Sequence, residues 1–452
     1  MTDRAAIAAF RFGYGLPMAG PSDPAALLAQ LTGPDQAALR WPAYGSPAVV
    51  QIMQAARTAR HMPQTTDAEI KARKKAQRRA VKAGKALATT AAKAAMARAL
   101  SGQGLRERMV TFWADHFTTV PRNRAQFAWP SALVEDAIRP NLAGRFGDML
   151  VAVITHPGML IYLDQSGSQG PASARGVKTG KGLNENLARE LLELHTLGVG
   201  AGYSQDDVRQ MAELLTGLTV SADQGFAFDP KRAEPGAEVV LGVEYGTDGV
   251  APVLAALQDL ALRPETARHI AGKLAVHFVS DTPDPTLVDA LAQAWIASGG
   301  DLTAVTQTLL AHPAAWTDQA EKARQPYDFI IASLRALGLG GDDVVAMADK
   351  AYLSMIEGPM AQMGQPWQTA PGPDGWPEEA AAWISPQGMA ARISWAMEMP
   401  GKLAVPLPAA AEVAARALGA RASERLLWAI SAAESRHEAL GLVLAAPEFN
   451  RR

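Results

Sequence analysis

The chain has 452 residues, of which 48% are hydrophobic and 19% are charged. This composition is that of an ordinary globular protein with ample apolar side chains for a core. The formal net charge is −2, so no overall field favours nucleic acid or an anionic membrane. The lack of cysteine excludes disulfides, thiolate nucleophiles and cysteine-ligated zinc or iron–sulfur sites.

Apolar residues recur at three- and four-residue spacing along most of the chain, a pattern that predicts helices. The predicted helices cover residues 24–31, 68–100, 104–117, 131–138, 147–154, 183–197, 205–216, 252–260, 263–278, 285–297, 302–311, 326–337, 388–397, 409–419, 423–430 and 436–444. Two short stretches, 226–228 and 239–243, favour strands that pair with each other. The predicted fold class is therefore all-α, a multi-helix globular array with one small β-hairpin near 226–243.

A chain of this length has room for more than one domain. We predict an N-terminal helical part at 1–220, a small hairpin insert at 221–247 and a C-terminal helical part at 248–452, with one continuous domain as the alternative. Two long loops interrupt the helices. Residues 164–182 are rich in Gly, Ser and Lys and form a candidate lid or a disordered loop. Residues 358–386 hold six prolines and three tryptophans, and form either a packed strap or a stacking surface for a sugar or aromatic ligand.

Membrane insertion is not predicted, because no apolar run reaches the roughly 18 residues that a spanning helix needs. The N-terminal apolar stretch is a poor signal peptide, since it is short and Arg11 follows it directly. As written, the chain is expected in the cytoplasm, or in the periplasm if a leader has been removed.

A basic run at 71–85 carries eight Lys and Arg in fifteen residues. Contact with nucleic acid or anionic lipid is one interpretation, and an exposed, solvated helical face is the other. The run contains no aromatic residue for base stacking. We favour the solvated face and expect no nucleic-acid partner.

Two histidines occupy positions that suit either a structural or a functional role. A helical wheel places His116 on an apolar face with Met109, Val110, Trp113 and Phe117, opposite Arg108, Thr111 and Asp115. Such a histidine is either a satisfied core residue or a catalytic or metal-ligating group, because an apolar site changes a histidine pKa. His156 precedes a proline, where it either caps a carbonyl or faces a site.

The most informative stretch is 182–203, GLNENLARELLELHTLGVGAGY. Its two glutamates and its histidine suggest carboxylate–histidine metal chemistry. The wheel separates them, however: Asn186, Arg189, Glu190 and Glu193 form one polar stripe, and His195 lies on the other side with Asn184. Four-residue spacing predicts ion pairs of Arg189 with Glu185 and Glu193. Gly198 and Gly200 end this helix, and Ser204 with Asp207 caps the next.

Several segments, in this order, resemble a bacterial family called domain of unknown function 1800. They include RFGYG (11–15), FWADHFT (112–118), THPGMLIYLD (155–164), the whole of 182–208, ARHIAGKLAVHFV (267–279) and GQPWQTAPGPDGWPE (364–378). The resemblance covers nearly the whole chain, and 182–208 is its most specific part. It implies an all-helical fold with no agreed activity, in proteins that are often exported and often encoded beside a sulfatase-like partner.

This chain departs from the pattern of the family at three places. Family members usually have Asn at the position of Asp115 and Trp at that of Leu218, and they tend to have His before the Pro-Gly at 235–236. If that histidine were a metal ligand, this chain would lack it. The departure leaves His116, His156 and His195 untouched.

Two functions follow as hypotheses. The first is an enzyme in which His116, His156 and His195 form one buried site for metal-assisted or acid–base chemistry. A divalent metal is its candidate cofactor, and its other candidate residues are Asp164, Asn184, Asn186, Arg189, Glu190 and Glu193. The second is a non-catalytic helical scaffold, serving as an accessory protein for the sulfatase-like partner.

Overall fold

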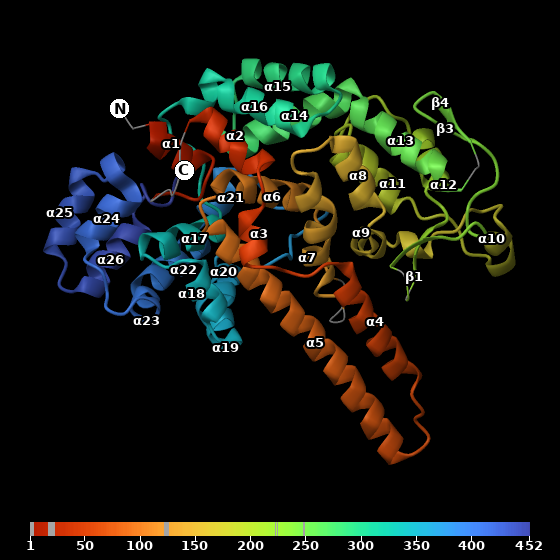
Figure 1. Ribbon diagram of the computed structural model, residues 1–452, viewed down its shortest axis with the longest axis horizontal. Coiled ribbons are helices and arrows are strands. Elements are labelled where there is room, and N and C mark those ends of the chain that lie inside the picture. Colours follow the sequence, from red (N-terminus) through yellow and green to blue (C-terminus); the bar gives the residue numbers. More distant parts are fainter. Residues whose placement is uncertain (1–3, 17–22, 122–125, 222, 224, 247–248) are drawn as a thin grey trace.

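The computed structural model describes residues 4–16, 23–121, 126–221, 223, 225–246 and 249–452, and confirms the mainly helical fold (Figure 1). The helices of the first half are α1 (Arg4–Arg11), α2 (Pro24–Thr32), α3 (Gln36–Arg40), α4 (Ser46–His61), α5 (Asp67–Ala99), α6 (Gly104–His116), α7 (Trp129–Leu133), α8 (Phe146–Ile154), α9 (Pro157–Tyr162), α10 (Ala174–Thr179), α11 (Asn186–Glu190) and α12 (Gln205–Leu214). Those of the second half are α13 (Ala251–Leu262), α14 (Pro264–Phe278), α15 (Pro285–Ser298), α16 (Leu302–Ala311), α17 (Pro326–Ala336), α18 (Gly341–Ala346), α19 (Asp349–Tyr352), α20 (Gly358–Gln362), α21 (Ala380–Trp383), α22 (Pro386–Glu398), α23 (Pro400–Leu403), α24 (Ala410–Leu418), α25 (Glu424–Ala432) and α26 (Arg436–Ala445).

Among the described residues the strands lie within 218–245, but their pairing differs from the prediction. Strands β1 (Leu218–Ser221) and β2 (Gly225–Phe228) form one antiparallel hairpin, and β3 (Glu238–Val240) and β4 (Val243–Tyr245) form another. The prediction that 226–228 pairs with 239–243 is therefore wrong. Each stretch pairs instead with its neighbour across a short turn, which needs less chain to be ordered than the longer connection between them.

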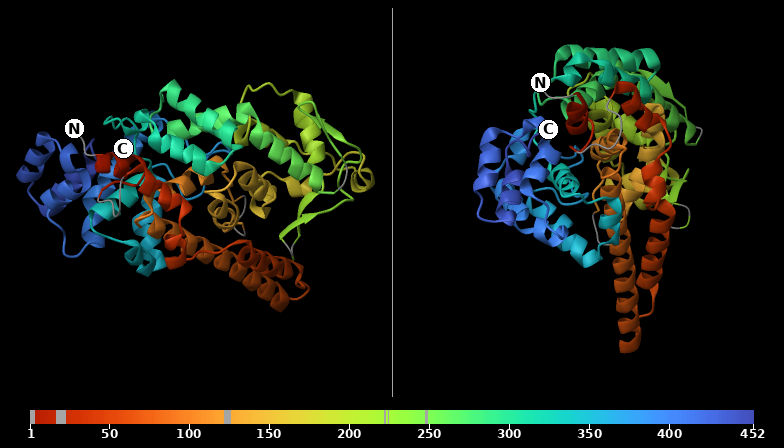
Figure 2. Two further views of the ribbon diagram at one scale, coloured as in Figure 1. Left: turned by 45° about the horizontal axis from the view of Figure 1, so that its top comes forward. Right: turned by 60° about the vertical axis from the view of Figure 1, so that its left-hand side comes forward.

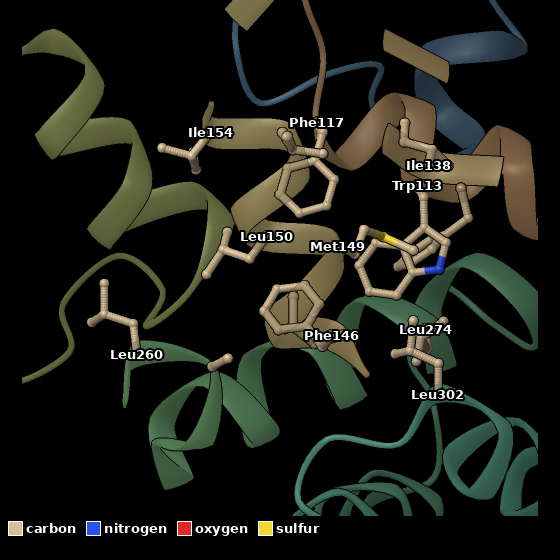
Figure 3. Close-up of a cluster of buried hydrophobic side chains, with 14 of the residues drawn as sticks. Trp113, Phe117, Ile138, Phe146, Met149, Leu150, Ile154, Leu260, Leu274 and Leu302 are labelled. Atoms are coloured by element: carbon tan, nitrogen blue, oxygen red, sulfur yellow. The ribbon is translucent and has the colours of Figure 1, made fainter. Parts of the chain in front are cut away.

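The main hydrophobic core joins helices from distant parts of the chain. Trp113 of α6 contacts Phe146 of α8, with ring centroids 5.5 Å apart, and Phe117 stacks beside them (Figure 3). Leu274 of α14 and Leu302 of α16 close the same cluster from the other side. The core therefore fixes α6 against α14, the two helices that carry most of the polar side chains discussed below.

A second core belongs to the C-terminal helices. It is formed mainly by side chains between Tyr327 and Phe449, to which the end of α5 adds Ala92, Met96 and Ala99. Along the chain, the main core thus ends at Ala315, and the C-terminal residues of the second core begin at Tyr327. The division of the chain into parts at 221 and 248 stays a prediction.

Helices α4 and α5 form an arm that projects from the body in every view (Figures 1 and 2). A capping box between Thr66 and Glu69 starts α5, and Ala80 and Gly84 lie on its buried face. Lys71, Lys74, Arg78 and Lys82 are exposed, as both interpretations of the basic run require, so the choice between them stays a prediction. Within the described residues, no helix, α5 included, is both long and apolar enough to cross a membrane.

Candidate functional site

His116 and His195 lie together inside the main core. Their ring centroids are 6.0 Å apart, and Nε2 of His116 lies 3.2 Å from the backbone oxygen of His195. His269 of α14 approaches the same place, with Nε2 3.1 Å from the backbone oxygen of Leu194. These two oxygens belong to a π-helical turn, Leu191–His195, at the end of α11. His116 and His269 therefore cap the end of that turn, a structural role.

Burial keeps these imidazoles uncharged. It lowers the pKa of His116 well below the ordinary value, and lowers the pKa of His195 to about 3. The nearby ammonium group of Lys273 adds to both effects. Both ring nitrogens of His195 lack a hydrogen-bond partner among the described residues.

His156 has a different set of neighbours. It precedes α9 and caps it, since Nδ1 accepts the Gly158 N–H at 3.0 Å. Its Nε2 lies 2.9 Å from Ser46 Oγ and 3.3 Å from a carboxylate oxygen of Asp136, and its ring packs on Trp129. These contacts form a complete cap at the base of the arm, and the convergence of His156 with His116 and His195 stays a prediction.

The polar stripe of 184–193 is occupied by local interactions. Arg189 pairs with Glu185 at 3.2 Å and with Glu193 at 3.3 Å, which confirms the predicted four-residue pairs. Asn184 accepts the Asn186 N–H at 3.0 Å and donates to the oxygen of Leu163, so both asparagines start the helix.

The remaining two predicted residues lie at the edges of this region. Burial raises the pKa of Glu190, helped by the charges of Glu193 and Asp374. Asp164 is exposed and has a left-handed backbone, with φ of 57°. Among the described residues, no group of three or more His, Asp or Glu side chains could hold a metal ion. The metal hypothesis thus has no ligand set here, and it stays a prediction.

A cavity of about 140 Å³ lies against the other face of α6. The wheel placed Thr111 and Asp115 on that face, and both line the cavity together with Glu107. The polar side of α6 is itself covered by the rest of the protein, since Arg106, Glu107 and Arg108 are also buried. The rest of the wall comes from α5, the segment after α6, α7 with the turns that follow it, α14, α17, α20 and the loop between α20 and α21. The Trp/Pro-rich loop thus supplies Trp367 and Trp376 to the cavity, and it packs as a strap through buried Trp383.

His277 and Glu378 form a hydrogen-bonded pair in the cavity wall. Nδ1 of His277, on α14, lies 2.5 Å from Oε1 of Glu378, on the loop. A carboxylate at this distance selects the tautomer with the proton on Nδ1, which leaves Nε2 as an acceptor. Nε2 is buried and has no hydrogen-bond partner among the described residues.

Electrostatics keep this pair as neutral imidazole and ionised carboxylate. Burial lowers the pKa of His277, although Glu378 opposes the effect. Burial alone would raise the pKa of Glu378, but His277, Lys322 and Arg452 together hold it well below its ordinary value. Lys322 also anchors the loop, because its Nζ lies 2.9 Å from Oε2 of Glu378 and donates to the backbone oxygen of the same residue at 2.8 Å.

Asp115 stands between this cavity and a second one of about 550 Å³, which His116, His269 and Lys273 also line. Its Oδ1 accepts the Trp376 N–H at 2.9 Å. Burial raises the pKa of Asp115 to about 7, and the charge of Glu378 adds to this effect. Both the protonated and the ionised form of Asp115 are therefore present near neutral pH. A carboxyl group and an imidazole with displaced pKa values in one cavity are typical of an active site.

Sequence reasoning did not select His277 or Glu378 as site residues. Both residues lie in segments that carry the family resemblance, His277 in 267–279 and Glu378 in 364–378, and this was the available signal. Their separation in sequence hid the pair.

A family model described as a protein of unknown function, DUF1800, matches residues 11–451. No curated protein and no solved structure matches the chain.

Proposed function

Because the chain belongs to the DUF1800 family, whose function is unknown, we propose that it is an enzyme with His277 as its general base. The observation that supports this proposal is the pair of His277 and Glu378 in the wall of the cavity, with Nε2 of His277 left without a partner among the described residues. The proposal keeps the predicted acid–base chemistry of a buried histidine and moves its centre to His277.

In the proposed step, neutral Nε2 takes a proton from a substrate hydroxyl or from water. The imidazolium that forms keeps its Nδ1–H bond to Glu378, whose negative charge stabilises it. Lys322 holds both the carboxylate and the backbone oxygen of Glu378, so Glu378 and Lys322 act as positioning residues. Asp115 takes part as the neutral acid, which donates a hydrogen bond without repelling Glu378.

Turnover of chromogenic substrates tests the proposal. Untagged protein is assayed with nitrophenyl acetates, phosphates and glycosides between pH 5 and 9. We expect one series to be converted, His277→Gln to lose at least a hundredfold in rate, as removal of a general base does, and Glu378→Gln to lose rate as well. The matched control is His437→Gln on α26, where the side chain is exposed. Conversion that survives in His277→Gln, or a panel with no conversion, contradicts the proposal.

The scaffold hypothesis makes a different prediction. It expects the chain to co-purify with a sulfatase-like partner from cells of its natural host and to convert no substrate. Fractionation of the same cells would assign the compartment, cytoplasm or periplasm.

A further inference from the structure

Buried polar atoms without partners gather around the cavity beside α6. Six residues of its wall each have such an atom among the described residues. Two of these atoms, Arg139 Nε and Glu378 Oε2, lie in ion pairs with Glu135 and Lys322. The other four atoms are Glu107 Oε1, Thr119 Oγ1, His277 Nε2 and Trp367 Nε1. Folded proteins hydrogen-bond nearly all of their buried polar groups. A cluster of four in one wall therefore indicates that the cavity holds a polar ligand.

The kinds of atoms in this set limit the chemistry of the ligand. The carboxylate oxygen of Glu107 accepts a hydrogen bond, and so does Nε2 of His277 while its Nδ1 donates to Glu378. The indole N–H of Trp367 only donates, and the hydroxyl of Thr119 does both. Two ligand hydroxyls can donate to the first two atoms, one to each, and a hydroxyl oxygen can accept from the third. An ammonium group only donates and a carboxylate only accepts, so neither satisfies the whole set.

The charges of the wall are already balanced inside the protein. Arg98 pairs with Glu135 at 2.6 Å, and Arg139 pairs with Glu107. Glu378 has Lys322 as its counterion. An anionic ligand would find no free cation among the described residues of this wall, and a cationic ligand would find only Asp115, which burial keeps partly protonated. Either ligand would also lose its hydration on entry. The wall therefore favours an uncharged ligand.

Aromatic side chains supply the apolar part of the wall. The rings of Tyr327 and Trp367 lie with centroids 5.5 Å apart, and Trp376 lines the cavity from the same loop. Aromatic faces beside hydrogen-bonding groups suit a ring compound that has C–H faces and hydroxyl edges.

We propose that this cavity binds a neutral saccharide. The inference rests on the proposed function, since it identifies a sugar hydroxyl as the group from which Nε2 of His277 takes a proton. The proton moves to Nε2, and the hydroxyl oxygen keeps the electron pair of the broken O–H bond.

A glycan array that displays neutral, sulfated and carboxylated oligosaccharides tests the inference. Labelled wild-type protein is used, and circular dichroism checks the fold of each variant. We expect binding to neutral glycans. Trp367→Phe and Thr119→Val should each weaken it by roughly three- to tenfold, the effect of one hydrogen bond. The matched control is Trp428→Phe on α25, where the side chain is 71% exposed.

The outcomes separate this inference from the proposed function. Binding to charged glycans only, or to none, overturns the saccharide inference, even where nitrophenyl acetates or phosphates are still converted in a His277-dependent manner. Neutral-glycan binding that Trp367→Phe and Thr119→Val leave unchanged also overturns it. Conversion that survives in His277→Gln, together with neutral-glycan binding, overturns the general base and leaves the saccharide site standing.

Discussion

Replacing Arg139 by methionine tests the buried ion-pair network beside the cavity. The guanidinium of Arg139 pairs with Glu107 of α6 and with Asp35, which caps α3, at 2.5 Å. In the variant, Asp35 still has an ion-pair partner, since Arg106 lies 3.7 Å from its carboxylate. Glu107 has no ion-pair partner other than Arg139 among the described residues. The Glu107 side chain is only 4% exposed. Removing one member of a buried pair costs about 3–5 kcal/mol, because the other charge stays desolvated.

The effect should depend on pH in a direction that the pKa of Glu107 sets. Burial already raises this pKa in the folded protein, and the loss of Arg139 raises it further. A carboxyl with a raised pKa carries no penalty below its unfolded pKa, and the penalty grows as pH rises above that value. Arg139→Met should therefore cost more stability at pH 8 than at pH 5.

Urea denaturation followed by circular dichroism measures the free energy of unfolding at both pH values. The double variant Glu107→Gln/Arg139→Met is the control, since it removes the charge that Arg139 neutralises. We expect the double variant to recover most of the loss. A loss below about 1 kcal/mol for the single variant at pH 8, or a double variant no more stable than the single, would refute a desolvated charge as the cause.

Three further predictions use other parts of the structure. Turnover should fall as pH rises through about 7, because ionised Asp115 repels Glu378, and it should also fall on the acid side as His277 takes up a proton. In a pH–rate profile, Asp115→Asn should remove only the alkaline fall. An unchanged profile would contradict this prediction. Gly375→Ala should lower the melting temperature more than Gly364→Ala does. Both glycines have positive φ, but only the new Cβ at 375 would lie 2.7 Å from Asp115 Oδ1. Equal shifts of the melting temperature in differential scanning fluorimetry would argue against this contact. Trp113→Ala should cost about 3–5 kcal/mol in urea denaturation, because the ring is 2% exposed in the main core; a loss below about 1 kcal/mol would mean that the core refills the space.

Local features of the fold could be predicted from the sequence because they depend on residues within four positions of each other. The helical fold class follows from apolar spacing, and the capping box of Ser204 and Asp207 and the two ion pairs of Arg189 are present as predicted. His116 also lies on an apolar face, against the rings of Trp113 and Phe117.

Features that depend on tertiary packing could not be predicted in the same way. Local spacing cannot show that 226–228 pairs with 218–221, nor that the polar face of α6 is buried against a strap. The segment 182–208 is the most specific part of the family resemblance. Asn184 starts its helix, and His116 and His269 cap the end of that helix, whereas the candidate base lies elsewhere. Asp115, His277 and Glu378 come from α6, α14 and a loop far apart in the chain. Only the packing of those elements brings the three side chains into one cavity, where burial changes their pKa values. The sequence by itself therefore determines the helices, whereas the tertiary structure determines the site.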